Sequence, residues 1–242
     1  MGEKRMYHVK IKNEVKEYEA GITYHDIAKE YQKDYEHEIV LVFVDGKLQE
    51  LHKRLKKDCE ISFVTTADPI GHESYKRSMS FLLVKAVYDV AGHKNIDKVR
   101  MHFAIGPGYY CTITGETRVD DDFLERVESR MHELVEADLS IKKRTVHTDE
   151  AIGLFGQYGM YDKELFRYRR VSKVNLYSIN EFEDYYYGYM LYSTGYLKYF
   201  KLYRYDEGFV LQMPEIDKPE IVPHFQARTK FFQVMKESVK WG

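Results

Sequence analysis

The sequence predicts an α+β protein in two parts, and three observations lead to this prediction. The first 66 residues contain strand-like segments around one short helix. After Pro69 the hydrophobic period becomes that of a long helix, and helices and strands then follow one another as far as Met213. Prolines beyond that point indicate an extended connection to one last helix. We therefore place domains at residues 1–67 and 68–213, and a linker with a C-terminal helix at residues 214–242.

The first domain is expected to be a β-grasp domain. Apolar and polar side chains alternate at residues 7–11, which predicts a strand. Thr23 is placed to cap a helix over residues 24–31. The β-branched run at residues 39–44 predicts a second strand, and residues 61–64 another. Strands around one crossing helix form a β-grasp sheet if the first strand pairs with one of the later two.

The second domain is expected to be α+β. Its helices are predicted by apolar residues at helical spacing, and its strands by alternation between turn signals. The expected elements are a polar connection at residues 68–71, helices at 73–91, 120–135 and 148–159, a hairpin at 99–114, a strand at 141–146 and several strands within 173–213.

A final helix is predicted at residues 229–240, where Phe231, Phe232 and Val234 form an apolar patch. Such a patch needs a surface that covers it. We therefore expect the chain to continue into a further domain beyond Gly242.

Composition excludes several classes of protein. The 242 residues are 44% hydrophobic and 31% charged, which is typical of globular domains with a sizeable core. The net charge of −2 gives no overall attraction to nucleic acid or to anionic membranes, so any contact with nucleic acid must be local. Cys59 and Cys111 belong to no paired motif, and no apolar run suits a signal peptide or a membrane span. We expect a soluble, cytoplasmic protein without a membrane partner.

Several short motifs carry a family resemblance. Each is weak alone, but they occur in a shared order over about 200 residues, which makes chance similarity improbable. They lie at residues 17–28, 44–48, 68–83, 104–110, 130–134 and 200–202 and include an Ile-Gly-Pro turn and a Phe-Lys-Leu triplet. In this order they resemble the N-terminal region of threonyl-tRNA synthetases. The resemblance implies a TGS domain, which is a β-grasp domain, followed by an editing-like α+β domain.

The resemblance also locates a cleft that has lost its chemistry. The family's editing domain uses a His-x-x-x-His pair on its first helix and a Cys-x-x-x-His pair in a later loop. Alignment on Ser78 and on the Phe-Lys-Leu triplet places Arg77 and Phe81 at the first pair, and Tyr186 and Met190 at the second. None of these four is a zinc ligand. We expect a degenerate cleft with no metal, no cofactor and no catalytic residue, in which Arg77 could contact an anion.

A second resemblance bears on the role of the chain. The tyrosine-rich residues 184–200, residues 159–163 and the tail at 231–241 are most similar to the N-terminal region of nucleoside kinases of the uridine-kinase type. This resemblance implies a non-catalytic accessory region whose partner is its own C-terminal kinase domain. The phosphate-binding Gly-x-x-x-x-Gly-Lys-Ser/Thr motif does not occur in the sequence. ATP and magnesium are therefore expected only in a kinase domain outside this chain.

Two alternatives remain open at this stage. The chain could be a trans-acting aminoacyl-tRNA deacylase with a substituted site, or an RNA-binding homologue of the editing domain. Basic clusters at residues 53–57, 142–144 and 167–170 could contact the phosphates of RNA if the fold brings them together, or could be solvated faces. The ligand of the whole chain could be a nucleotide or RNA. The sequence does not decide between them.

Overall fold

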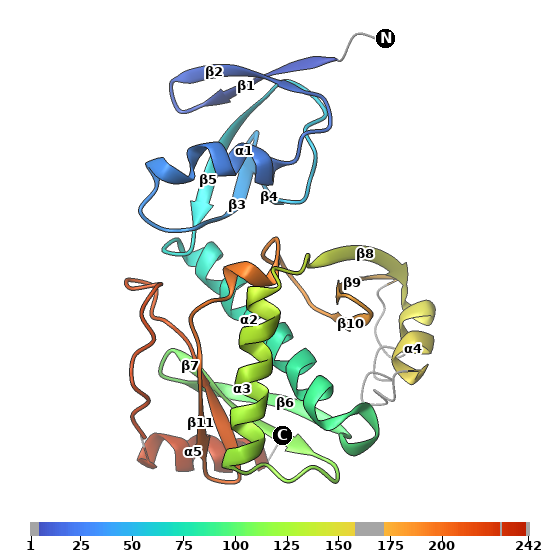
Figure 1. Cartoon of the computed structure of the whole chain (residues 1–242), viewed down its shortest axis with the longest axis vertical. Helices are drawn as coiled ribbons and strands as arrows, with labels where there is room; N and C mark the ends of the chain where they lie inside the picture. The colour runs from blue at the N-terminus through green and yellow to red at the C-terminus, as the bar shows by residue number, and fades with distance from the viewer. Residues whose placement is uncertain (1–4, 158–171, 228, 241–242) are drawn as a thin grey trace.

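A computed structural model describes residues 5–157, 172–227 and 229–240 (Figure 1). The N-terminal sheet and its helix lie at the top of the view, and α2 leads from them into a larger second domain. The expected basic cluster at residues 167–170 and the segment at 159–163 lie outside the described residues.

The N-terminal domain is a five-stranded sheet crossed by one helix. Its elements are β1 (Met6–Ile11), β2 (Glu14–Glu19), α1 (Tyr24–Tyr31), η1 (Gln32–Asp34), β3 (Ile39–Val44), β4 (Lys47–Glu50) and β5 (Cys59–Thr65). The strand order is β2-β1-β5-β3-β4, with β1 parallel to β5 and the other neighbours antiparallel. Thr23 caps α1 by accepting a hydrogen bond from the Asp26 amide. The β-grasp prediction and the pairing of the first strand are thus confirmed.

The second domain contains two separate sheets and four helices among the residues that the structure describes. Its helical elements are α2 (Pro69–Ala91), η2 (His93–Asn95), α3 (Asp121–Glu136), α4 (Thr148–Gln157), η4 (Thr194–Tyr196) and α5 (Thr229–Lys240). Its strands are β6 (Lys98–Ile105), β7 (Gly108–Thr114), β8 (Lys142–His147), β9 (Lys173–Ile179), β10 (Phe182–Tyr185), β11 (Lys201–Tyr205) and β12 (Gly208–Gln212). The sheets have the orders β11-β12-β7-β6 and β10-β9-β8. The predicted α+β class is confirmed.

The long helix begins earlier than predicted. Residues 68–71 were expected to be a connection, but α2 begins at Pro69. Proline is tolerated in the first turn of a helix, because the amide that it lacks would have no helical partner there. The Asp68 carboxylate accepts a hydrogen bond from the Thr65 amide at 2.6 Å, so the end of β5 and the start of α2 are joined directly.

The four-stranded sheet is covered on both faces. Alternate residues of β7 and β12 point to opposite sides. Cys111, Phe209 and Leu211 belong to the main core, which also contains the buried faces of α2 and α3. Tyr110 and Val210 belong to a smaller cluster, where α5 packs. Figure 1 shows α5 beside this sheet at the lower left, whereas α4 and the three-stranded sheet lie at the right.

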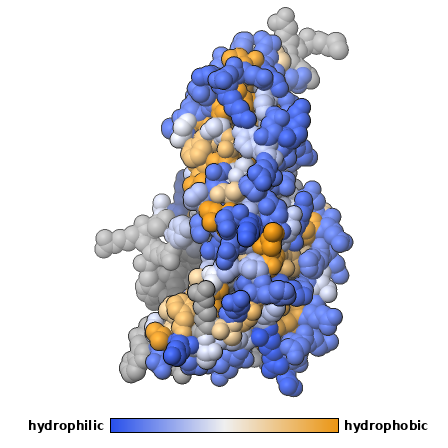
Figure 2. Space-filling view, turned by 90° about the vertical axis from the view of Figure 1, so that its left-hand side faces the viewer, coloured by the Kyte–Doolittle hydropathy of each residue, from blue (hydrophilic) through white to orange (hydrophobic). Residues whose placement is uncertain are grey.

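One face of the molecule is predominantly polar. Figure 2 shows hydrophilic side chains over most of one face, with hydrophobic residues emerging among them in patches. Among the described residues, no helix combines the length and the hydrophobicity needed to cross a membrane.

One of the three residues of the apolar patch predicted on the last helix is covered by the chain itself. Phe232 is only 1% exposed, and its ring lies 4.9 Å from the ring centroid of Tyr110 and 5.8 Å from that of Phe103. Phe231 and Val234 are 44% and 64% exposed. The expectation that all three side chains need another domain is therefore wrong for Phe232, because the outer face of the four-stranded sheet covers it.

Phe232→Ala should undock α5. Loss of a buried phenyl ring costs about 3 kcal/mol or more in a packed core, and amide hydrogen exchange in α5 should accelerate accordingly. Phe231→Ala is the matched control, and it should change the free energy of unfolding by about 0.5 kcal/mol or less because that ring is partly solvated. Equal effects of the two substitutions would contradict the packing described here.

Candidate functional site

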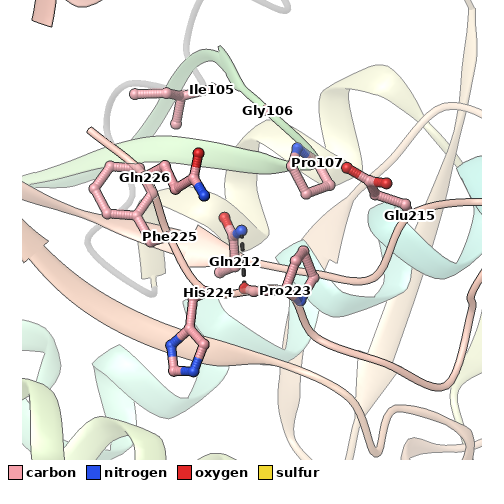
Figure 3. A pocket seen from close by; sticks show the side chains of 9 residues that line it. All are labelled: Ile105, Gly106, Pro107, Gln212, Glu215, Pro223, His224, Phe225 and Gln226. Atoms are coloured by element: carbon pink, nitrogen blue, oxygen red, sulfur yellow. Dashed lines mark hydrogen bonds between the residues drawn. The ribbon is translucent and has the colours of Figure 1, made fainter. Parts of the chain in front are cut away.

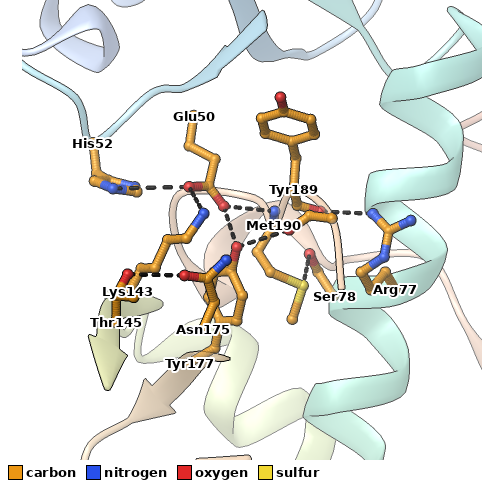
Figure 4. A network of polar contacts seen from close by, with 11 residues as sticks. Glu50, His52, Arg77, Ser78, Lys143, Thr145, Asn175, Tyr177, Tyr189 and Met190 are labelled. Carbon is orange, nitrogen blue, oxygen red and sulfur yellow. Dashed lines mark hydrogen bonds and ion pairs between the residues drawn. The ribbon is translucent and has the colours of Figure 1, made fainter. Parts of the chain in front are cut away.

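The predicted cleft lies where α2 faces the segment that follows β10. Arg77 and Phe81 are one turn apart on α2 and share a face of the helix. Tyr186 and Met190 come from the facing segment, and Figure 4 shows Arg77 and Met190 on the two sides of the contact. The structure therefore brings α2 and residues 186–190 together.

Arg77 is tied to the backbone of that segment. Its guanidinium donates a hydrogen bond to the Tyr189 carbonyl oxygen at 2.8 Å. Gly188 has φ of +101°, and a Cβ atom placed on it would lie 2.7 Å from the Arg77 guanidinium carbon. The backbone conformation at 188 therefore favours glycine, and a larger residue there would also displace the guanidinium. The contact of Arg77 with an anion stays a prediction. It would use the guanidinium N–H groups that do not bind the Tyr189 carbonyl oxygen.

The other three positions form an apolar filling. Phe81 is fully buried, and its ring centroid lies 5.3 Å from that of Tyr186. Burial raises the pKa of the Tyr186 phenol well above its ordinary value, and the nearby Asp184 carboxylate acts in the same direction. Met190 is 2% exposed, with its sulfur 3.6 Å from the Ser78 hydroxyl oxygen.

Ser78 closes the contact from the helix side. Its hydroxyl donates to the Ser74 carbonyl oxygen at 2.8 Å and accepts a hydrogen bond from the Leu191 amide at 2.9 Å. The side chain is completely buried. A hydroxyl group held in this way links α2 to the facing loop and has no general base positioned to make it a nucleophile.

A buried carboxylate from the first domain borders the same contact. Glu50, the last residue of β4, is 2% exposed. It accepts hydrogen bonds from the Tyr177 hydroxyl at 2.7 Å, the Met190 amide at 3.0 Å and the Lys143 ammonium group at 3.1 Å. Figure 4 shows these groups converging on the carboxylate, with His52 beside it. The three donors compensate the desolvation of the charge.

Tyr177 connects the two parts of this network. Its hydroxyl lies 2.7 Å from a Glu50 carboxylate oxygen and 2.8 Å from the Gly188 carbonyl oxygen. A phenol has one proton, so the two acceptors share it. Burial, and then the Glu50 charge, raise the pKa of Tyr177 far above its ordinary value. The phenol therefore remains a neutral donor.

The sequence did not identify Glu50 or Tyr177 as part of the site. A glutamate at the end of a short strand normally indicates a solvated position. No local pattern marks either residue, because the Tyr177 hydroxyl and the Glu50 carboxylate that it binds are 127 residues apart in the chain. The partners of Glu50 are 93 to 140 residues distant in the chain, which no local pattern encodes.

The donors in the cleft do not suit a transition metal. A guanidinium, a phenyl ring, a neutral phenol and a thioether do not offer the imidazole, thiolate or carboxylate set that zinc prefers. In the part of the chain that the structure describes, no three His, Cys, Asp or Glu side chains are grouped so that they could hold a metal ion.

A second hollow lies away from the cleft, between the β6–β7 turn and the extended segment before α5 (Figure 3). Its volume is about 160 Å³, and Gln212 forms part of its wall. The Gln212 amide donates to the Pro223 carbonyl oxygen at 3.2 Å, whereas its buried oxygen has no hydrogen-bond partner among the described residues. A water molecule or a small donor group could satisfy that oxygen.

Comparison with known proteins places these observations in a family context. No family model matches the chain. It is similar to the threonine–tRNA ligase of Thermotoga sp. (strain RQ2), with 32% identity over 188 residues, which is 77% of this chain and 29% of that protein. The corresponding ligases of Carboxydothermus hydrogenoformans and Legionella pneumophila (strain Corby) are 31% and 30% identical, and each match covers 78% of this chain.

The chain spans about 29 to 30% of the length of these relatives. The similarity supports a threonyl-tRNA synthetase type of N-terminal region, with TGS and editing-like domains. It agrees with the β-grasp sheet and the α+β domain described above.

Glu50→Gln should destabilise the domain junction. Glutamine keeps the shape and an acceptor oxygen but removes the charge that faces Lys143, whose side chain is 18% exposed. We expect a loss of about 2 kcal/mol in the free energy of unfolding, measured by denaturant titration.

Glu60→Gln is the control, because it breaks the exposed pair with Lys10 at 3.2 Å and should cost about 0.5 kcal/mol or less. Adding Lys143→Met to Glu50→Gln should restore part of the lost free energy of unfolding, because it removes the ammonium group that Glu50→Gln leaves unpaired. Strictly additive effects of the two changes would show that the ion pair is not coupled.

Proposed function

We propose that this chain is a non-catalytic accessory region built on a tRNA-synthetase editing scaffold. The observation that carries the proposal is the filled contact between α2 and residues 186–190. Phe81 and Met190 are buried in it, and Arg77 binds the Tyr189 carbonyl. Within the described residues, these side chains occupy the contact and offer no thiolate or imidazole to a substrate ester.

The remaining polar groups at the contact do not supply acid–base chemistry. A general base must be accessible and must titrate near the working pH. The Glu50 carboxylate is 2% exposed and already accepts three hydrogen bonds. The Tyr186 phenol has a strongly raised pKa, so it does not ionise near neutrality. The Ser78 hydroxyl is held between two backbone groups.

The proposal extends to the larger protein in which the region works. The tyrosine-rich segment at 184–200 resembles the N-terminal regions of uridine-kinase-type nucleoside kinases. We place the chain before such a kinase domain, as a binding or regulatory region, with ATP and magnesium bound only by that domain. The reading frame of the gene tests this directly, because it should encode a Gly-x-x-x-x-Gly-Lys-Ser/Thr motif downstream. A stop codon directly after residue 242 would remove the kinase from the proposal.

A second candidate function is favoured by the similarity to threonine–tRNA ligases. In this alternative the chain hydrolyses mischarged tRNA in trans, or binds tRNA without hydrolysis. Its catalysis would have to come from substrate hydroxyls and positioning, with Arg77 as the cationic group.

A deacylation assay separates the two candidates. Purified chain is mixed with seryl-tRNA specific for threonine, and release of serine is followed against spontaneous hydrolysis. We expect no acceleration, because loss of general base catalysis alone removes about 10² to 10⁴ in rate. An editing-competent threonyl-tRNA synthetase is the positive control. Turnover that disappears in Arg77→Ala but persists in Lys76→Ala would make the chain an enzyme and overturn the accessory role.

A further inference from the structure

A hollow on the β-grasp domain is lined mainly by cationic side chains. Its volume is about 420 Å³, and it lies between the β3–β4 turn and the segment that follows β4. The cationic residues that line it are Lys47, Lys53, Arg54, Lys56 and Lys57. Asp45 is the one acidic side chain among its described lining residues. Such a concentration of charge is notable in a chain whose net charge is −2.

Most of the positive charge in the hollow has no counter-charge among the residues that the structure describes. Asp45 is already paired, because its carboxylate lies 2.6 Å from the Lys57 ammonium group and accepts a hydrogen bond from the Glu60 amide. Lys47, Lys53 and Lys56 are exposed and form no ion pair with any residue that the structure describes.

Arg54 has a fixed position at the rim. One guanidinium nitrogen donates to the Gly21 carbonyl oxygen at 2.7 Å, which orients the group without neutralising it. The planar guanidinium group has further N–H donors, which can bind another acceptor. The wall beside it contains Tyr24, which is 6% exposed and therefore rigid.

The second basic cluster of the sequence is different. Lys143 is paired with the buried Glu50, and Arg144 binds Glu183 at 2.8 Å and Glu150 at 2.9 Å. Two of its three cations are therefore paired within the fold, and Lys142 is exposed. Of the two basic clusters within the described residues, only the one at 53–57 keeps several uncompensated cations around a concave surface.

We propose that this hollow binds a run of adjacent phosphate groups, such as those of an RNA strand or of a nucleoside polyphosphate. Closely spaced cations gain most from a ligand that carries several charges, because each neutralised phosphate releases condensed counterions. Lysine ammonium groups on flexible stems adapt to phosphates at variable spacing, and the oriented Arg54 adds a directional contact. This site goes beyond the accessory role, because it does not depend on whether the cleft at Arg77 is catalytic.

The test compares two triple variants with equal changes of charge. One is Lys47→Gln, Lys53→Gln and Lys56→Gln. The control is Lys33→Gln, Lys94→Gln and Lys218→Gln, three exposed lysines outside the hollow. Binding of a short labelled oligouridylate RNA is measured by fluorescence polarisation over a series of salt concentrations, and thermal unfolding confirms that both variants are folded.

The hollow variant should bind the RNA about tenfold more weakly near 50 mM salt. The plot of the logarithm of its association constant against the logarithm of the salt concentration should be less steep by about 2, as expected for the loss of three contacts with a single strand. The control should stay within about twofold of the unmodified chain. Equal losses in both variants, or no loss in the hollow variant, would overturn the proposal.

Inorganic tripolyphosphate distinguishes the two sources of phosphate. Saturable tripolyphosphate binding that the hollow variant loses, without RNA binding, assigns the site to a free polyphosphate. RNA binding that tripolyphosphate displaces only weakly assigns it to a strand. Absence of binding by both probes at low salt shows that the hollow is not a phosphate site. None of these outcomes depends on the deacylation assay, so the two proposals can fail separately.

Discussion

The buried carboxylate of Glu50 is the interaction on which the junction of the two domains depends. It lies on β4, the edge strand of the β-grasp sheet, and its three donors all belong to the second domain. A buried charge is tolerated only with such partners, because its desolvation costs several kcal/mol. If one domain moved against the other, the carboxylate would lose these hydrogen-bond donors before water could replace them. The domain junction and the wall of the cleft are therefore one structural unit.

The cleft between α2 and residues 186–190 is closed by its own side chains. The Ser78 hydroxyl holds α2 to the Leu191 amide, and Phe81 packs on Tyr186. These contacts replace solvent and ligand with side chains, so the contact contributes to the core.

Much of the fold was predictable from the sequence, because local patterns encode it. The β-grasp strands and the hairpin at the Gly106 turn follow from alternation and turn chemistry. The strand β2 was not predicted, since five of its six residues are exposed and leave no alternating pattern. For Phe232 the sequence indicated an apolar helix, but it could not show that the outer face of a distant sheet would cover it. The role of Glu50 was hidden for the same reason, because its partners meet it only in the folded chain.

The fit between Arg77 and Gly188 bears on whether a metal site could arise in the cleft. A smaller imidazole in place of Arg77 would leave the Tyr189 carbonyl without its donor and a void beside Gly188. A new metal ligand at 190 would meanwhile have to replace a methionine that fills the core. Each step toward a metal site would cost stability before the complete set of ligands could bind and compensate. The present packing therefore opposes the stepwise appearance of a metal site in this cleft.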